Sequence, residues 1–310
     1  MYIVSKYSEL LKPKVIVITG PTASGKSALA IEVAKRLDTE IVSADSRQIY
    51  KGIPIVTAMP TAEEQAEVPH HLIDMLNLDQ YYSASMFEQD ALKIIRRLLE
   101  EKGSAVVCGG SMMYVDALCN GIDELPTVPD SIRNGLLAEY AEKGEMWLLK
   151  ELEKLDPEYY SVVDKNNLKR VVHAVEIIRA SGKTYTELRT GKKVEREFRI
   201  EKFMIDMPRP QLFDRINRRV DAMVEAGLEE EARRVYHLRL LNSLNTVGLK
   251  EMFAWFDGTM QRTEAIERIK KNTRVYAKKQ LTWWAKDNAI KRITLPDCCG
   301  VPSELDSELR

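Results

Sequence analysis

Eight consecutive residues, 20–27, have the types and spacing of a loop that binds phosphate groups. They read Gly-Pro-Thr-Ala-Ser-Gly-Lys-Ser, which fits Gly-x4-Gly-Lys-[Ser/Thr]. Glycines let backbone N–H groups turn toward a polyphosphate, Lys26 adds a positive charge, and the Ser27 hydroxyl can reach a magnesium ion. We expect Ser27 to be the ligand of Mg2+, and the phosphate-binding residues to be Gly20, Thr22, Ala23, Ser24, Gly25, Lys26 and Ser27.

The residues on either side of this loop support that prediction. An apolar run at 15–18 precedes it, and residues 28–37 carry apolar side chains at helical spacing. A strand, a loop and a helix in this order are the setting in which the motif binds a ligand, whereas an ordinary Gly-rich turn does not require Lys-Ser at its end. The loop leaves open whether the ligand is a nucleoside triphosphate.

Asp45 is the first carboxylate that can serve chemistry beside the loop, because it follows the strand expected at 40–43. An Asp at a strand end is rigid enough to act as a general base, but it can equally cap a turn or bind Mg2+. No acid convinces as the second carboxylate of an ATPase. Asp206 lies far along the chain, and the strand expected at 105–108 ends in two glycines.

Hydroxyl and guanidinium groups can complete such a site. Ser111 follows Gly109 and Gly110 at a strand-to-helix turn, where it can cap the helix or approach a ligand. Arg215 and Arg219 are four residues apart and share a helix face, and two guanidinium groups suit a diphosphate. A solvated face with acidic partners would have the same pattern.

Residues 270–284 mix basic side chains with one tyrosine and two tryptophans. Cations contact phosphates and aromatic rings stack on unpaired bases, which is how proteins hold single-stranded RNA loops. An amphipathic helix with aromatic core residues and solvated lysines is the alternative. Lys and Arg outnumber Asp and Glu by 15 to 8 in residues 164–220 and by 10 to 3 in residues 262–292. This segregation fits a polyanion footprint or two solvated helix faces.

The composition is typical of a cored globular protein, with 310 residues of which 45% are hydrophobic and 30% are charged. No apolar run approaches the roughly 20 residues that cross a bilayer, and residues 1–10 lack a signal-peptide pattern. The cysteines Cys108, Cys119, Cys298 and Cys299 show no metal-binding spacing. We therefore expect a cytoplasmic protein with reduced thiols.

The elements that must position these residues alternate in type. We expect strands at 14–19, 40–43, 71–76 and 105–108, and helices at 26–37, 84–100 and 112–119. This order predicts an α/β fold, a P-loop NTPase-like parallel sheet flanked by helices. In such a sheet the ligand site lies beyond the carboxyl ends of the strands, so Gly20, Asp45 and Ser111 should face one crevice.

The second half of the sequence is mostly helical in pattern. A Pro-rich break at 125–129 precedes helices that are interrupted at Gly144, at Pro157 and at 181–182. A strand is expected at 198–207, helices at 211–285 and a frayed tail at 302–310. We therefore expect a core domain made of 1–124 and 198–310, with a helical insertion domain at 125–197.

Taken together, these segments resemble the tRNA dimethylallyltransferases, or tRNA isopentenyltransferases, which modify the adenosine 3′ of the anticodon. The most specific part combines the Gly-Pro-Thr-x-x-Gly-Lys loop with Ala-Asp-Ser-Arg-Gln at 44–48. The resemblance extends over most of the chain, through 69–74, 109–114, 168–170, 174–177, 181–183, 247–248 and 273–283.

This resemblance implies a prenyl transfer. The loop, Arg215 and Mg2+ would hold the diphosphate of dimethylallyl diphosphate, while Asp45 would deprotonate the N6 amine of a flipped-out adenosine. Ser111 and Arg219 would assist the reaction. The resemblance also implies a monomer that grips the anticodon stem-loop of tRNA through Asp45, Ser46, Arg47, Gln48, Lys169, Arg170, His173, Val247, Gly248, Lys250, Arg274, Lys278, Lys279, Gln280 and Trp283.

Two segments depart from the family pattern. The family's Val-Gly-Tyr-Arg-Gln is Val-Gly-Leu-Lys-Glu at 247–251, and its His-Pro-Asn-Asp is Asp-Lys-Asn-Asn at 164–167. Both fall where tRNA contact is expected, so they bear on substrate choice more than on chemistry. Eukaryotic relatives carry a zinc finger that this sequence lacks, so we expect a bacterial-type enzyme. The alternatives are a P-loop small-molecule kinase and a divergent tRNA-binding paralogue with reduced activity.

Overall fold

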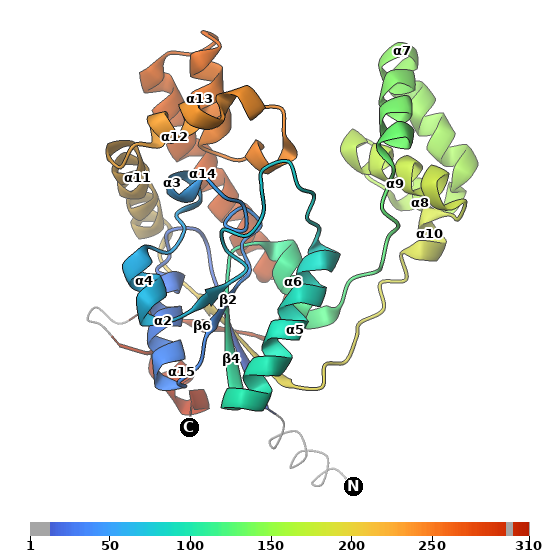
Figure 1. The fold of residues 1–310 in the computed structure, drawn as a ribbon. Coiled ribbons are helices and arrows are strands. Elements are labelled where there is room, and N and C mark those ends of the chain that lie inside the picture. The colour runs from blue at the N-terminus through green and yellow to red at the C-terminus, as the bar shows by residue number, and fades with distance from the viewer. Residues whose placement is uncertain (1–12, 296–299, 310) are drawn as a thin grey trace, which may run out of the picture. The chain divides into compact units, whose positions relative to one another are not determined.

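The computed structural model describes residues 13–295 and 300–309 (Figure 1). Cys298, Cys299 and residues 1–10 lie outside the described residues. The chain divides into two compact units. One is made of the residues up to Asn120 together with those from Glu195 onward, and the other is Gly121–Val194. No helix among the described residues has both the length and the apolarity that a membrane crossing requires.

The first unit is built on a parallel sheet. Within the described residues its strands lie in the order β3-β2-β4-β1-β5-β6, and every pairing between neighbours is parallel. The strands are β1 (Lys14–Thr19), β2 (Ile41–Ser43), β3 (His70–His71), β4 (Ser104–Cys108), β5 (Arg199–Ile205) and β6 (Ile290–Ile293). The parallel α/β fold that the sequence predicts is therefore confirmed.

Alternate residues of the central strands face opposite layers of helices, as the pleat of a strand requires. Val15 and Val17 pack in a cluster with α5 (Ala84–Lys102) and α6 (Met112–Asn120). Ile16 and Ile18 pack in another cluster with α2 (Lys26–Arg36) and α15 (Ser303–Leu309). Helices thus cover both faces, so β1 is buried on both sides and reads as a continuous apolar run.

A third cluster joins the connection between β2 and β3 to a group of helices, through Ile49, Ile53, Leu249 and Ile269 among others. It gathers the segments that stand beyond the carboxyl ends of the strands (Figure 1). These segments are α3 (Pro54–Thr57), α11 (Arg209–Glu225), α12 (Leu228–Val235), η1 (Tyr236–Leu238), η2 (Asn242–Leu244), α13 (Leu249–Phe256) and α14 (Arg262–Trp284). By contrast, α4 (Ala62–Glu67) lies beside α2, and its Glu67 pairs with Lys35 of that helix (Figure 1).

The second unit is helical and has its own core, which includes Leu136, Leu148, Leu152 and Val175. Gly144 has a positive φ of 79° and kinks the first helix, and Gly182 in the left-handed region ends the third. The expected breaks at these glycines are confirmed, because glycine adopts positive φ at little cost. The helices are α7 (Asp130–Leu155), α8 (Pro157–Val162), α9 (Leu168–Ser181) and α10 (Tyr185–Leu188).

Two expectations about elements are wrong. The strand expected at 71–76 is reduced to His70–His71, and Leu72 and Asp74 adopt positive φ values of 60° and 49° that break the strand. The tail expected to fray at 302–310 contains α15, whose Leu305 is fully buried. Its apolar side chain completes the layer over α2, which a short polar sequence does not reveal.

Candidate active site

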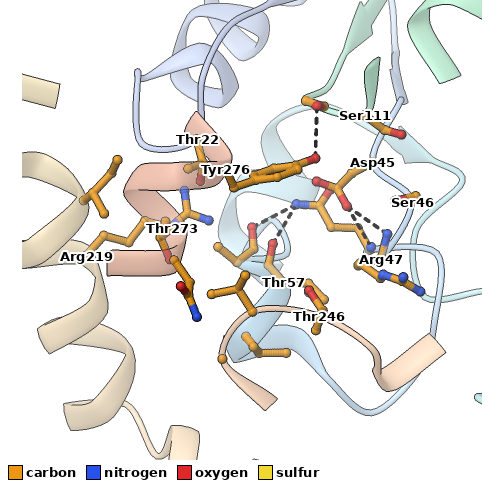
Figure 2. A pocket seen from close by; sticks show the side chains of 18 of the residues that line it. Thr22, Asp45, Ser46, Arg47, Thr57, Ser111, Arg219, Thr246, Thr273 and Tyr276 are labelled. Carbon is orange, nitrogen blue, oxygen red and sulfur yellow. Dashed lines mark hydrogen bonds between the residues drawn. The ribbon is translucent and has the colours of Figure 1, made fainter. Parts of the chain in front are cut away.

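A cavity of about 580 Å³ opens where the strands end, and the described residues that line it include Lys26, Asp45 and Ser111 (Figure 2). The strand β4 lies between β2 and β1, so the residues after these two strands must meet across its end. Gly109 permits this approach, because a Cβ there would lie 2.2 Å from the Ala44 carbonyl oxygen. The crevice predicted for Asp45 and Ser111 is thus formed.

Only one of the two oxygens of the Asp45 carboxylate is hydrogen-bonded among the described residues. Its Oδ1 atom accepts the backbone N–H groups of Arg47 at 2.9 Å and Gln48 at 3.3 Å, as Figure 2 shows. Its Oδ2 atom has no hydrogen-bond partner among the described residues. The side chain is half-buried and lines the cavity. A carboxylate fixed through one oxygen with the other facing a cavity is arranged to accept a proton.

Two cations face Asp45 across this cavity. Burial lowers the pKa of the Lys26 ammonium from its ordinary value of 10.5, and the Asp45 carboxylate opposes this effect. Burial also lowers the pKa of Arg219, which extends from α11 into the cavity (Figure 2), and Asp45 again opposes it. Both cations have therefore lost part of their hydration, and a bound anion would compensate for this loss by charge attraction.

A second cavity, of about 440 Å³, lies on the other side of the phosphate loop. Its described lining contains Lys26, Arg215, Arg218 and Arg219 and no acid. Arg215 also donates from Nε to the Ala23 carbonyl at 2.9 Å, so it is fixed against the loop. Lys26, Ser27 and Arg219 line both cavities, so two ligands can reach these residues from different sides.

Arg218 is absent from the residues that we expect at the diphosphate. It pairs with Asp214 at 2.5 Å, and the helical spacing of three from Arg215 is the signal that could have revealed it.

Two expected phosphate-loop residues line neither cavity. The Ser24 side chain is fully buried, and its Oγ atom has no partner among the described residues. Gly20 has a φ of 152°, and a Cβ there would lie 2.9 Å from Ser24 Oγ. These residues shape the loop from inside, whereas Thr22, Ala23, Gly25, Lys26 and Ser27 line one or both cavities.

The residues after Asp45 brace the wall of the cavity. The Arg47 guanidinium donates to the carbonyls of Asn242, Ser243 and Asn245 at 3.0–3.3 Å, which fixes the segment that leads to Val247 and Gly248. The Gln48 amide donates to the carbonyls of Thr57 and Ala58 (Figure 2). Thr57 also lines the cavity, although no sequence pattern marks it.

Most of the residues at 247–251 that differ from the family pattern point into the protein core. Leu249 is fully buried in the third cluster. Glu251 is 5% exposed, accepts the Gly248 N–H at 2.8 Å and accepts the Asn272 amide at 2.6 Å. Of the three changed residues only Lys250 is exposed and lines the cavity. The changed residues Leu249 and Glu251 therefore still support the wall of the cavity, and Lys250 provides one positive charge that faces it.

Helix α14 carries exposed basic and aromatic residues as well as residues that pack against the site. Lys278, Lys279 and Trp283 are exposed, and Arg274 donates to Asn217 at 2.5 Å. Tyr276 lies along the cavity beside Asp45, and burial raises its pKa to about 12 (Figure 2). Gln280, which we expected to face tRNA, is 1% exposed and bonded to the phosphate loop and the turn after β4. Gln280 also lines the first cavity, as a buried part of its wall.

The remaining residues expected to bind tRNA lie at the first cavity, along α14 and on the helical unit. Ser46 and Lys279 line the first cavity, whereas Lys278 and Trp283 do not. Lys169, Arg170 and His173 are exposed on α9 of the helical unit. His173 also contacts Glu176 at 2.9 Å, and that carboxylate is bound by Arg133 as well. These residues are available to a polyanion.

The donor set near the loop fits Mg2+ brought in with a diphosphate. Among the described residues, no three His, Cys, Asp or Glu side chains are grouped as a metal site. Mg2+ keeps several waters and binds few protein oxygens together with substrate phosphates. The Ser27 hydroxyl is exposed in both cavities and can supply one such oxygen.

Comparison with known proteins agrees with this geometry. The family described as IPP transferase matches residues 48–287. The chain is 50% identical over 279 residues to tRNA dimethylallyltransferase 1 of Bacteroides thetaiotaomicron, covering 90% of this chain and 91% of that one. It is 50% identical over 275 residues to tRNA dimethylallyltransferase 2 of Parabacteroides distasonis, covering 89% and 92%.

Solved structures are similar as well. The full-length tRNA isopentenylpyrophosphate transferase of Bacillus halodurans has a TM-score of 0.67 and 35% identity, covering 96% of this chain and 93% of that one. A eukaryotic dimethylallyltransferase solved acting on tRNA has a TM-score of 0.76 and 26% identity, covering 92% and 74%. Because the family match spans most of the sequence and the relatives match nearly end to end, the chain belongs to the IPP transferase family, as its motifs led us to expect.

Proposed function

We propose that this protein is a tRNA dimethylallyltransferase, which moves the dimethylallyl group of dimethylallyl diphosphate to the N6 amine of the adenosine 3′ of the anticodon and releases diphosphate. The observation that carries the proposal is the placement of Asp45 opposite Lys26 and Arg219 in one cavity. A proton acceptor and a pair of under-solvated cations are what an amine nucleophile and a diphosphate leaving group need.

Asp45 acts as the general base in this proposal. The amine nitrogen attacks the allylic carbon, the bond from that carbon to the diphosphate oxygen breaks, and one amine proton passes to Asp45 Oδ2. The two N–H groups on Oδ1 keep the carboxylate oriented. The target base must leave the anticodon-loop stack, so that its amine can reach Asp45 in the cavity.

Lys26 and Arg219 stabilise the charge that develops on the departing diphosphate. Burial leaves their solvation incomplete, so their interaction with an anion is stronger than on an open surface. Arg215 and the backbone of the loop complete the diphosphate site from the second cavity. Ser111 lies at the opposite wall, where its hydroxyl can bond to the reacting groups.

Magnesium supports the same site. When bound, Mg2+ neutralises charge on the diphosphate, and Ser27 would hold it from the protein side. Bound tRNA is contacted by Ser46, Lys250 and Lys279 at the cavity, by Arg274, Lys278 and Trp283 along α14, and by Lys169, Arg170 and His173 on the helical unit. We further propose that the enzyme acts as a monomer in the cytoplasm.

The kinase alternative lacks support at the cavity. Asp45 is the one carboxylate among the described residues that line it. Asp206, the other acid at a strand end, pairs with Arg292 at 3.6 Å and lines neither cavity. The tRNA-binding paralogue is also disfavoured, because Leu249 and Glu251 serve the fold and leave Asp45 and Lys26 in place.

One experiment tests the proposed reaction. Purified protein is mixed with total bacterial tRNA, dimethylallyl diphosphate labelled in its prenyl group and Mg2+, without ATP. We expect label in tRNA, located by nuclease digestion at the adenosine 3′ of the anticodon. An absence of label from tRNA that lacks this modification would refute the proposal, while ATP consumption in a parallel assay would favour a kinase. Size-exclusion chromatography with light scattering tests the monomer.

A further inference from the structure

Gln280 joins three segments that are far apart in the sequence. Its Oε1 atom accepts the Thr22 backbone N–H at 2.9 Å, and its Nε2 atom donates to the Gly110 carbonyl at 2.8 Å. Thr22 belongs to the phosphate loop, Gly110 to the turn after β4, and Gln280 to α14. A single side-chain amide therefore sets the spacing between these segments.

This contact requires a side chain that both donates and accepts. One end of the amide accepts and the other donates, whereas an ionised glutamate, the other polar side chain of this length, can only accept. The side chain is 1% exposed, and both ends of its amide are engaged. Each end makes one hydrogen bond, so the side chain is fixed in the wall of the first cavity.

The amide and the charged end of Lys26 both lie beside Gly110. A Cβ at position 110 would lie 2.7 Å from Gln280 Nε2 and 3.6 Å from Lys26 Cε. A glycine at position 110 therefore leaves room for both the amide and the lysine beside this turn. Displacing the amide would open the wall against which Lys26 rests and would free the Thr22 end of the loop.

The same helix also carries exposed lysines that a polyanion can reach. Lys278 and Lys279 precede Gln280 and are exposed, whereas Tyr276, one turn earlier, donates to the same Gly110 carbonyl at 3.4 Å. Residues 276 and 280 thus dock α14 onto the site, and its lysines lie on the solvent side.

We propose that Gln280 is a positioning residue for the diphosphate: it locks the phosphate loop against the Gly110 turn, keeps Lys26 in place, and does not contact tRNA. The inference rests on the proposed function for the identity of the ligand. In this proposal α14 both faces the RNA and supports the diphosphate site.

Gln280→Met tests this directly, because methionine fills similar space without a hydrogen-bonding amide. The probes are inorganic diphosphate with Mg2+, followed by calorimetry, and a synthetic anticodon stem-loop, followed by fluorescence anisotropy. We expect Kd for diphosphate to rise about tenfold or more and Kd for the stem-loop to change by less than about twofold, since the hydrogen bonds to the loop and to the Gly110 turn are both lost. Lys278→Ala is the contrasting variant and should show the reverse. Weaker stem-loop binding with unchanged diphosphate binding in Gln280→Met would overturn the proposal.

Gln280→Glu provides a second test that a misfolded variant cannot mimic. An ionised carboxylate accepts from Thr22 but repels the Gly110 carbonyl and the diphosphate, whereas a protonated one donates and accepts as glutamine does. We expect the ratio of its diphosphate Kd to that of wild type to fall as pH drops from 8 to about 5.5, since burial favours the neutral acid. The ratio for Gln280→Met should stay flat. A flat ratio for Gln280→Glu would contradict the positioning role.

The two proposals fail separately. If wild type prenylates tRNA but Gln280→Met binds diphosphate normally, the role of Gln280 is wrong and the reaction stands. If wild type transfers no prenyl group while both variants lose diphosphate binding as described, the reaction is wrong and the role of Gln280 stands.

Discussion

The Oδ1 atom of Asp45 accepts the backbone N–H of Arg47 at 2.9 Å, while the Arg47 side chain holds the segment before Val247. The base and one wall of its cavity are therefore set by the same residue. A substitution that keeps the turn at Asp45 can separate its chemistry from its structural role.

Asp45→Asn is that substitution. The amide oxygen still accepts the two backbone N–H groups, but the side chain no longer takes a proton. We expect kcat to fall by about 10²–10⁴-fold, the usual contribution of a general base, while Kd for inorganic diphosphate stays unchanged. Single-turnover transfer of the labelled prenyl group measures this. Near-normal turnover by Asp45→Asn would mean that another group accepts the proton.

Arg219→Gln removes a half-buried cation that lines both cavities. We expect kcat to fall by about 10²–10³-fold, as when one donor to a developing anion is lost. Arg209→Gln is the matched control, because Arg209 is exposed on the same helix and lines neither cavity. Steady-state kinetics with tRNA and dimethylallyl diphosphate compare the two. Equal effects would show that the loss reflects the charge of the helix and not the position of Arg219.

The affinity for diphosphate should depend on alkaline pH. Burial lowers the pKa of Lys26 from 10.5, so the ammonium loses its proton at a lower pH than an exposed lysine does. The protonated form binds the anion, and affinity should therefore decline as pH rises through that lowered pKa. Calorimetry with inorganic diphosphate across this range measures the decline. Lys26→Arg should flatten it, since a guanidinium stays charged, and an unchanged profile in that variant would assign the decline to another group.

The last helix should contribute to stability. Leu305 is fully buried in the cluster that contains the phosphate-loop helix. Leu305→Ala should lower the free energy of unfolding by about 2–4 kcal/mol, the range for a buried leucine. Ser307→Ala changes an exposed residue of the same helix and should stay within about 0.5 kcal/mol of wild type. Urea unfolding followed by circular dichroism measures both, and equal midpoints would show that the helix is not part of the core.

Several parts of this arrangement follow from local sequence. The strands at β1 and β4 and the helices α2, α5 and α6 were expected within two residues of their observed ends, because long apolar periodicity reports burial directly. The family resemblance is confirmed, since motifs such as the phosphate loop and Asp45 carry their chemistry in adjacent residues. The elements that were missed, α3, α4, β6 and α15, are short and carry little periodic signal.

The sequence by itself determined the phosphate loop, the position of Asp45 at a strand end and the family, because these depend on residues that are neighbours in the chain. Only the tertiary structure decided that Asp45 meets Lys26 and Arg219 in one cavity and that α15 belongs to the core. It also decided that Gln280 turns inward while Lys278 and Lys279 remain exposed. The physical reason is that a helix of mixed composition does not reveal which of its polar residues find buried partners. Those partners, Thr22 and Gly110, lie 258 and 170 residues away.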